Sequence, residues 1–405
     1  MEPKTQDGQE RASLAASLRH RARVLAGNPA IFVLTSVLLL VPVFWQPRLQ
    51  AGDVSRRLHN AWLSHFLENG QAKGLVMVRE TTNILFDRVL GSLFKIVGPE
   101  AAQRLAVSLL VLIFVWGAFA FVHAVSNRWA WHLLPSIAML AYGWVFQMGF
   151  FDFYLSLGLC LWSLSLAWSG RPRRLIAAAG LLGLSYLANA VPLVWTACLL
   201  AFLCLVRRTA PQRRGLVTGS FLLVLVLIQV VVTRTMVTQW SPQQLTLGTG
   251  VDQLWVFDGK YYLVLIGLLA AWGMLFLEML RRGGAREIVH GVPFHICLMS
   301  STAVAVLPSM VLLPGFHYAL VYIAERMSLG VGICVCSLVA AANAKAFVRY
   351  TLVVVALVFF GFLYRDERAL NSFQDRMQDL VSRAAPNWVG PSAPASHAHR
   401  PGGRS

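Results

Sequence analysis

Long apolar runs almost without charged side chains restrict this chain more than any other feature. Runs such as 103–123 and 347–364 are long enough to cross the hydrocarbon core of a bilayer, which needs roughly 20 apolar residues and sometimes as few as ~17. Helices satisfy their own backbone hydrogen bonds in lipid, whereas a membrane β-barrel would show alternating apolar and polar residues. With 57% hydrophobic and only 13% charged residues, the chain is predicted to be an all-α polytopic membrane protein.

The apolar runs predict about eleven transmembrane helices in a membrane bundle over residues 30–364. Basic residues gather in alternate short loops, and loops of this kind face the cytosol. The amino terminus, with a basic tail over 1–29, is therefore expected in the cytosol. Residues 365–405 are expected outside, as a charged helix and a disordered tail. The expected spans are 30–45, 103–123, 131–147, 154–168, 175–187, 191–206, 216–232, 261–280, 289–313, 327–342 and 347–364.

The formal net charge of +17 raises the question of nucleic acid binding. Because the arginines lie in short loops between apolar runs, the positive-inside rule explains this charge, and no nucleic-acid partner is expected. The six cysteines lie in apolar runs and are expected to be packing thiols. No cofactor is predicted. A divalent metal stays open, but Cys334 and Cys336 have no nearby histidine or carboxylate in the sequence to complete a metal site.

The loop 46–100, between the first two spans, holds an unusual share of the polar residues. Within 53–67 apolar side chains recur every three or four positions, and 86–97 repeats this pattern. Amphipathic helices of this kind lie in the membrane interface. The loop is therefore predicted to form two interfacial helices and to be the outer catalytic loop.

Three short strings accompany this layout: Phe146-Gln-Met-Gly-Phe-Phe-Asp-Phe153, Tyr186-Leu-Ala-Asn189 and Ala324-Glu-Arg-Met-Ser328. With one span, a long acid-containing loop and about ten further spans, the chain up to about residue 364 resembles the C-type (GT-C) membrane glycosyltransferases, especially bacterial members. The resemblance implies sugar transfer from a polyprenyl-phosphate donor at the outer face of the bacterial inner (plasma) membrane, in the cell envelope. Two positions depart from the family pattern. Many members carry paired acids in the first loop, where this chain has only Asp53 near the first span. Members often have a histidine where this chain has Asn189.

Asp53 is the position that matches the first-loop acid of the family, so the resemblance implies that it is the catalytic general base. A carboxylate within hydrogen-bond reach of an acceptor hydroxyl can take its proton. Asp53 also directly precedes the first amphipathic stripe, where Asp is a favoured helix N-cap. The sequence leaves both roles open, and they can coexist.

Four basic residues are candidates for binding the donor phosphate: Arg326, Arg56, Arg57 and Lys260. Guanidinium groups stabilise the charge that develops on a leaving polyprenyl phosphate. Arg326 is the first choice because it lies at the expected membrane edge beside Glu325. The alternative for each of these side chains is contact with lipid headgroups.

Four further residues are candidates for binding substrate: His59, Asp152, His317 and Tyr318. A lone carboxylate near the membrane, such as Asp152, is costly and often functional, but it can also cap the fourth span. His59 could orient an acceptor or a phosphate, or make an interfacial polar contact. Tyr318 could stack on a sugar face, although tyrosine is also common at membrane interfaces.

The expected function is transfer of a sugar from a polyprenyl-phosphate donor to an outward-facing lipid or glycan acceptor. The alternative from another class is a non-catalytic transporter or flippase for a lipid-linked glycan, which would show ionisable residues deep in several spans and internal repeats. A degenerate, structural relative of the enzymes is a third alternative. A further prediction is that Asp53 and Arg326 open onto one shared cavity that a sugar phosphate can bridge. The sugar, the acceptor and the oligomeric state are left open.

Overall fold

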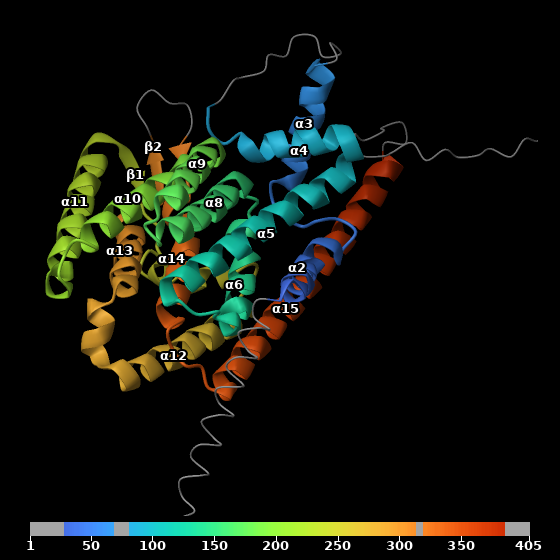
Figure 1. Cartoon of the computed structure of the whole chain (residues 1–405). Coiled ribbons are helices and arrows are strands. Elements are labelled where there is room, and N and C mark those ends of the chain that lie inside the picture. The colour runs from blue at the N-terminus through green and yellow to red at the C-terminus, as the bar shows by residue number, and fades with distance from the viewer. Residues whose placement is uncertain (1–27, 69–80, 313–318, 385–405) are drawn as a thin grey trace, which may run out of the picture.

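The computed structural model describes residues 28–68, 81–312 and 319–384. Within these ranges the chain is mostly helical, with one small sheet, so the predicted helical class is confirmed there (Figure 1). The α-helices are α2 (Pro29–Phe44), α3 (Val54–Glu68), α4 (Leu85–Val97), α5 (Pro99–Ser126), α6 (Leu134–Ala141), α7 (Trp144–Gln147), α8 (Phe151–Ala167), α9 (Pro172–Ala188), α10 (Ala190–Val206), α11 (Arg214–Thr235), α12 (Tyr261–His290), α13 (Val292–Val306), α14 (Ile323–Val339) and α15 (Ala346–Ala384). Short 3-10 turns are η1 (Trp131–Leu133), η2 (Pro211–Arg213), η3 (Thr246–Thr249) and η4 (Val251–Leu254).

Four helical segments are long and apolar enough to cross a membrane: α5, α12, α15 and Pro211–Thr235, which contains α11. These segments indicate a membrane protein. α11 exposes large apolar side chains such as Leu216, Leu223 and Leu227, as a lipid-facing helix does. The other expected spans coincide with α-helices of 17 residues or fewer, or with a broken helix, so the predicted count of eleven is not confirmed.

The core of the bundle is built around α5 and α8, whose backbones approach closely. A Cβ atom added at Gly117 would lie 2.7 Å from the carbonyl oxygen of Gly158, so a larger residue would push the helices apart. Beside this crossing, the buried rings of Phe114 and Tyr154 lie 4.4 Å apart. The glycine pair therefore lets large aromatic side chains pack on either side of a close helix crossing.

The third expected span, 131–147, is interrupted, which corrects the sequence prediction. Its residues form η1, α6 and α7, and α6 and α7 are separated around Gly143. A Cβ atom at Gly143 would lie 2.5 Å from the carbonyl oxygen of Gln253. The side-chain oxygen of Gln253 accepts a hydrogen bond from the Val145 amide at 3.3 Å. Unwound backbone is tolerated within a membrane bundle where protein satisfies it, and Gln253 does so here.

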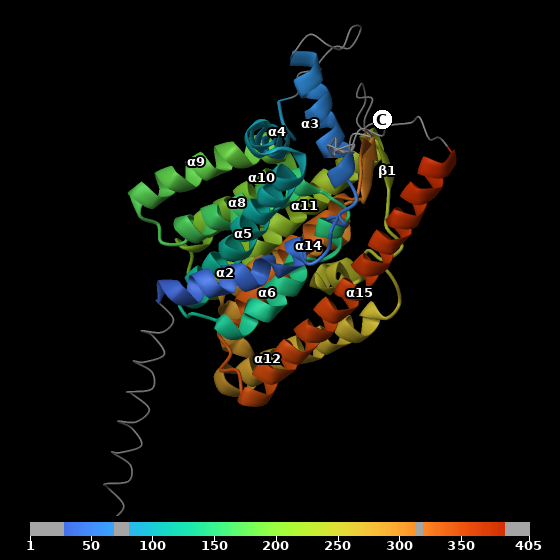
Figure 2. The ribbon, with the colours of Figure 1, turned by 90° about the vertical axis from the view of Figure 1, so that its right-hand side faces the viewer.

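The first long loop contains two helices, α3 and α4, over nearly the ranges that the amphipathic stripes predict. α4 packs on α5 and buries Phe86 and Leu90. α3 packs against α4 and projects beyond the bundle in both views (Figures 1 and 2). That the two helices lie in the membrane interface remains a prediction.

The junction between α9 and α10 is fixed by Asn189. Its side-chain oxygen accepts a hydrogen bond from the Val191 amide at 3.0 Å, which caps α10. Its side-chain nitrogen donates to Oδ1 of Asn83 at 2.7 Å. The Ile84 amide donates to the carbonyl oxygen of Leu187 at 3.0 Å. Asn189 therefore joins α10 to the segment that leads into α4.

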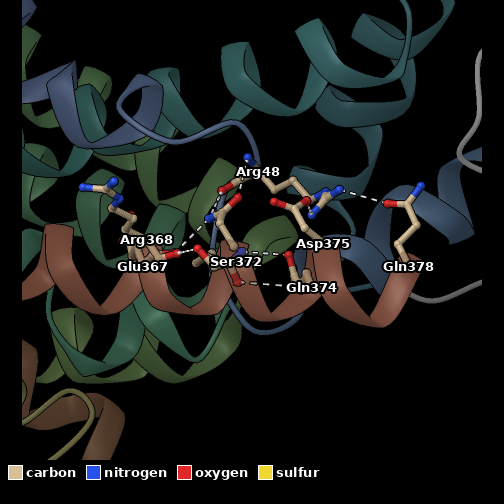
Figure 3. A network of polar contacts seen from close by, with 9 residues as sticks. Arg48, Glu367, Arg368, Ser372, Gln374, Asp375 and Gln378 are labelled. Atoms are coloured by element: carbon tan, nitrogen blue, oxygen red, sulfur yellow. Dashed lines mark hydrogen bonds and ion pairs between the residues drawn. The ribbon is translucent and has the colours of Figure 1, made fainter. Parts of the chain in front are cut away.

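The long helix α15 unites two segments that the sequence analysis separates. The eleventh expected span and the charged helix after residue 365 form one continuous helix of 39 residues. Its carboxyl-terminal part runs beside residues 46–50 (Figure 3). There Arg48 Nη1 lies 2.7 Å from Asp375 Oδ1, and Gln50 donates to Gln374 at 2.8 Å. Residues 1–27 and 385–405, which hold most of the predicted cytosolic tail and the predicted disordered tail, lie outside the described residues.

A small antiparallel sheet, which the sequence analysis does not predict, lies at the same end of the molecule as α3 and α4 (Figure 1). β2 pairs with both neighbours. It corrects the ninth expected span, 289–313, because α13 ends at Val306 and the chain continues as a strand. The strands are β1 (Val237–Gln239), β2 (Met310–Leu312) and β3 (Ala319–Leu320).

Candidate functional site

Asp53 is held at the start of α3 by a turn over residues 147–150, called here the 147–150 turn. The Gly52 amide donates to the carbonyl oxygen of Gln147 at 2.7 Å. Gly149 has a φ of +77°, and a Cβ atom there would clash with the backbone of Asp53. The Asp53 carbonyl accepts the hydrogen bond of the Arg57 amide at 3.1 Å, so Asp53 occupies the N-cap position of α3.

The carboxylate of Asp53 contacts arginine side chains. Its Oδ1 lies 2.8 Å from Arg56 Nε, and its Oδ2 lies 3.5 Å from Arg57 Nε. The Asp53 side chain is 25% exposed, so solvent or a ligand can reach it. The backbone of Asp53 thus starts the helix while its carboxylate pairs with cations; a side-chain cap and the predicted catalytic role would both use that carboxylate.

Arg57 joins three carboxylates. Its Nη1 lies 2.7 Å from Asp87 Oδ1 and 2.6 Å from Asp152 Oδ2. Asp152 is buried and also accepts a hydrogen bond from the Phe86 amide at 3.1 Å. α3, α4 and α8 therefore meet at one guanidinium group. The set is called here the Arg57 cluster: Asp53, Arg56, Arg57, Asp87 and Asp152.

The electrostatics of the Arg57 cluster favour a structural role for Arg57. Burial lowers the pKa of Arg57, and the carboxylates of Asp152 and Asp87 raise it, so that the pKa lies above its ordinary value. Arg57 is bound to the carboxylates of Asp87 and Asp152 and is therefore not free to bind a phosphate. Of its two cations, Arg56 is the accessible one, with 74% of its side chain exposed.

Arg326 also contacts the 147–150 turn, through Phe150. Its guanidinium carbon lies 4.9 Å from the centre of the Phe150 ring and 5.4 Å from that of Phe153, in cation–π contacts. Its Nε donates to the carbonyl oxygen of Tyr322 at 3.1 Å. Burial lowers the pKa of Arg326 to about 10, against the opposing effect of Glu325. Asp53 and Arg326 thus both contact the 147–150 turn, but a cavity that both line remains a prediction.

The other sequence candidates divide between this region and other parts of the chain. Lys260 pairs with Asp258 and with Asp366 on α15, at the contact between α12 and α15. His59 is exposed and stacks on Trp62, with ring centres 5.6 Å apart. Asp152 belongs to the Arg57 cluster and binds Arg57 and the Phe86 amide, as described above. His317 and Tyr318 lie outside the described residues.

A cavity of about 570 Å³ lies beside α7, and we call it the Asp252 cavity. Its volume falls in the range of small-molecule sites, roughly 300–1,000 Å³. Among the described residues that line it, two are carboxylates, none is basic, and several are aromatic. The lining residues are Trp144, Gln239, Trp240, Ser241, Pro242, Gln243, Leu247, Asp252, Trp255, Val256, Phe257, Ser309, Met310, Val321, Tyr322 and Glu325.

Asp252 is held in this cavity by one of its carboxylate oxygens. Oδ2 accepts hydrogen bonds from Ser328 Oγ at 2.6 Å and from Gln253 Nε2 at 3.1 Å. Oδ1 is buried and has no hydrogen-bond partner in the part of the chain that the structure describes. Burial raises the pKa of Asp252 to about 7; Ser328 and Gln253 oppose the shift, and Glu325 adds to it.

Asp252 and Glu325 are not among the site residues predicted from the sequence. The sequence signal that could have indicated Asp252 is a carboxylate close to a tryptophan, as in Asp252-Gln-Leu-Trp255. Nothing in the sequence brings that string next to Glu325, because η4 and α14 meet only through the tertiary fold. Among the described residues there is also no group of three or more His, Cys, Asp or Glu side chains that could hold a metal ion.

Comparison with known protein families, with characterised proteins and with solved structures gives no match for this chain.

Proposed function

We propose that this protein is a membrane glycosyltransferase that moves a sugar from a polyprenyl-phosphate donor to a lipid or glycan acceptor, at the outer face of a bacterial inner membrane. The observation that carries the proposal is the position of Asp53. It is a partly exposed carboxylate at the start of α3, on the turn that packs on Arg326. The resemblance to GT-C enzymes, whose first loop carries the catalytic acid, supports the same assignment.

In the proposed reaction Asp53 is the general base. The acceptor hydroxyl loses its proton to the Asp53 carboxylate, and its oxygen bonds to the anomeric carbon of the donor sugar. The bond from that carbon to the phosphate oxygen breaks, and the polyprenyl phosphate leaves with the electron pair. Arg56 is the cation that can reach this phosphate, since it is exposed beside Asp53. Arg57 acts as a positioning residue that holds α3 on α4 and α8.

The test is sugar transfer by the full-length protein in lipid nanodiscs. Polyprenyl-phosphate mannose, glucose and arabinose with labelled sugars serve as donors, and an extract of cell-envelope lipids and glycans serves as acceptor. We expect Asp53→Asn to abolish transfer, because the amide takes no proton. Asp53→Ser should also be inactive although serine can cap α3. The matched control is Glu68→Gln, which removes an exposed acid of the same helix that pairs with Lys95.

Two results would overturn the proposal: transfer by the Asp53→Asn protein at the rate of the unaltered protein, or no transfer from any of the three donors. The second result would favour a non-catalytic relative of the enzymes. One observation already favours that second candidate, because the carboxylate of Asp53 is paired with two arginines. An active control and an inactive, folded Asp53→Asn protein would exclude it.

A further inference from the structure

The Asp252 cavity differs from a phosphate site in its charge. Asp252 and Glu325 line it, and no lysine, arginine or histidine is among its described lining residues. Arg326 follows Glu325 but is not among the lining residues, so the side-chain charge that faces the cavity is that of the two carboxylates, which repel an anion at close range. The donor phosphate therefore does not belong in this cavity, and its ligand is neutral or positively charged.

Polar atoms without partners restrict further which class of ligand fits the cavity. Asp252 Oδ1, Glu325 Oε2 and Trp255 Nε1 are buried, and none has a hydrogen-bond partner within the described ranges of the chain. A carboxylate oxygen needs a donor, whereas the indole N–H needs an acceptor. A hydroxyl group provides both, but an alkylammonium group has no acceptor for Trp255. Each of these atoms is closed off from solvent, so its side chain must turn slightly to meet a ligand in the cavity. Because buried polar groups without partners cost free energy, a ligand that then pairs with all three gains affinity.

The aromatic walls suit the flat, apolar face of a sugar ring. Trp255 is fixed by stacking on Tyr262, with ring centres 5.4 Å apart. Trp144 packs edge-on against Tyr322, with ring centres 5.5 Å apart. Trp240 lines the same cavity and is 43% exposed. Aromatic rings beside hydrogen-bonding carboxylates combine an apolar surface with polar contacts at its edge.

We propose that the Asp252 cavity binds a neutral carbohydrate, whose hydroxyl groups pair with Asp252, Glu325 and Trp255. Trp144 lines this cavity and opens α7, the helix that leads directly into the 147–150 turn beside Asp53. The cavity is thus the site of the sugar acceptor, and this assignment rests on the proposed function. Binding of the carbohydrate itself does not depend on Asp53.

The test is a titration of tryptophan fluorescence with the full-length protein in nanodiscs made only of phospholipid. A detergent with a sugar headgroup is avoided because it would compete for the cavity. The probes are methyl α-glycosides of glucose, mannose, galactose and arabinose, with inorganic phosphate and choline as the anionic and cationic probes. We expect saturable binding of at least one glycoside and no binding of phosphate or choline.

Variants connect the signal to the cavity. Asp252→Asn and Glu325→Gln should each weaken glycoside binding about tenfold or more, because hydrogen bonds to charged groups contribute about 1.5–3 kcal/mol. Trp255→Phe keeps the ring but removes the N–H, and should weaken binding about 2- to 10-fold. The control is Asp258→Asn, an exposed acid of the same loop outside the cavity, which should bind as the unaltered protein does.

Two results would overturn the proposal: no glycoside binds, or the three cavity variants bind glycosides as tightly as the control does. Asp53→Asn separates this proposal from the proposed function. If that variant loses sugar transfer but keeps glycoside binding, both proposals stand. If glycosides bind but neither Asp53→Asn nor the cavity variants change the rate of sugar transfer, the proposed function fails and the cavity remains a carbohydrate site. Circular dichroism of each variant confirms its helical content before the titration.

Discussion

The Arg57 cluster and the Asp252 cavity both contain carboxylates, but only those of the Arg57 cluster are paired with arginines. In the Arg57 cluster each carboxylate is paired with an arginine, and the ion pairs join three helices. In the Asp252 cavity two carboxylates each keep a buried oxygen without a partner among the described residues. The comparison teaches that acids alone do not mark a binding site. Pairing marks a structural junction, and a missing partner beside open volume marks a place for a ligand.

The largest expected effect tests the structural side of this comparison. Arg57→Ala leaves the buried carboxylate of Asp152 without its cation and should destabilise the protein by about 3–5 kcal/mol. The measurement is thermal unfolding in nanodiscs. Arg56→Ala is the matched control, since Arg56 is 74% exposed, and it should change stability by less than about 1 kcal/mol. Equal effects of the two substitutions would mean that Arg57 does not hold the helices together.

The second prediction concerns the 147–150 turn, which contacts Asp53 of the Arg57 cluster and follows α7 beside the Asp252 cavity. Gly149→Ala places a Cβ atom against the backbone of Asp53 at a left-handed residue, and should cost about 1–3 kcal/mol of stability. It should also displace Asp53 and lower sugar transfer. Gly180→Ala in α9 is the control, because its Cβ atom meets open space and alanine favours a helix. A Gly149→Ala protein as stable as this control would show that the turn adapts.

The third prediction sharpens the assignment of Asp252. Its pKa is about 7 in the folded protein, above the value of an unfolded chain, and the charged group that faces it is Glu325 on α14. The folded state therefore binds the extra proton, and its stability falls as pH rises from about 4 to 7. Asp252→Asn removes this dependence. The Tm difference between the unaltered and variant proteins should fall across that window and then level off above pH 7. A constant difference from pH 5 to 8 would mean that Asp252 is ionised throughout.

The smallest expected loss of stability comes from an exposed ion pair, and it serves as a reference for the buried pairs of the Arg57 cluster. Arg48 and Asp375 form an ion pair in which both side chains are substantially exposed, 42% and 65%. Asp375→Asn should therefore cost only about 0.2–1 kcal/mol. The same unfolding measurement checks it, and adding salt should shrink the difference further. A loss as large as that of Arg57→Ala would show that exposure does not separate the two kinds of pair.

The sequence predicts the local elements well and the long-range contacts poorly. The stripes at 53–67 and 86–97 appear as α3 and α4, because periodic apolar residues report directly which helix face is buried. The break at Gly143 is not visible in the sequence, since it depends on Gln253 filling it from a distant loop. The strands are missed because three short segments become a sheet only by pairing with one another.

The same limit applies to the candidate site. Asp53 and Arg326 are chosen from their places near expected span ends, and the 147–150 turn brings both regions together. The pairing of Arg57 with Asp152 is not predicted, because those residues come from different helices. Asp252 is missed for the opposite reason: what distinguishes it is an oxygen without a partner, and a sequence does not show that.

The continuity of α15 has a mechanical consequence. At about 1.5 Å per residue, its 39 residues extend roughly 58 Å, nearly twice the ~30 Å hydrocarbon core of a bilayer. One part of this rod packs along α12, and the part beyond it is attached to residues 45–50 through Glu367 and Asp375 (Figures 2 and 3). α15 is therefore one continuous link between the α12 contact and the segment that leads into Asp53, and it ties the first loop to the far end of the bundle.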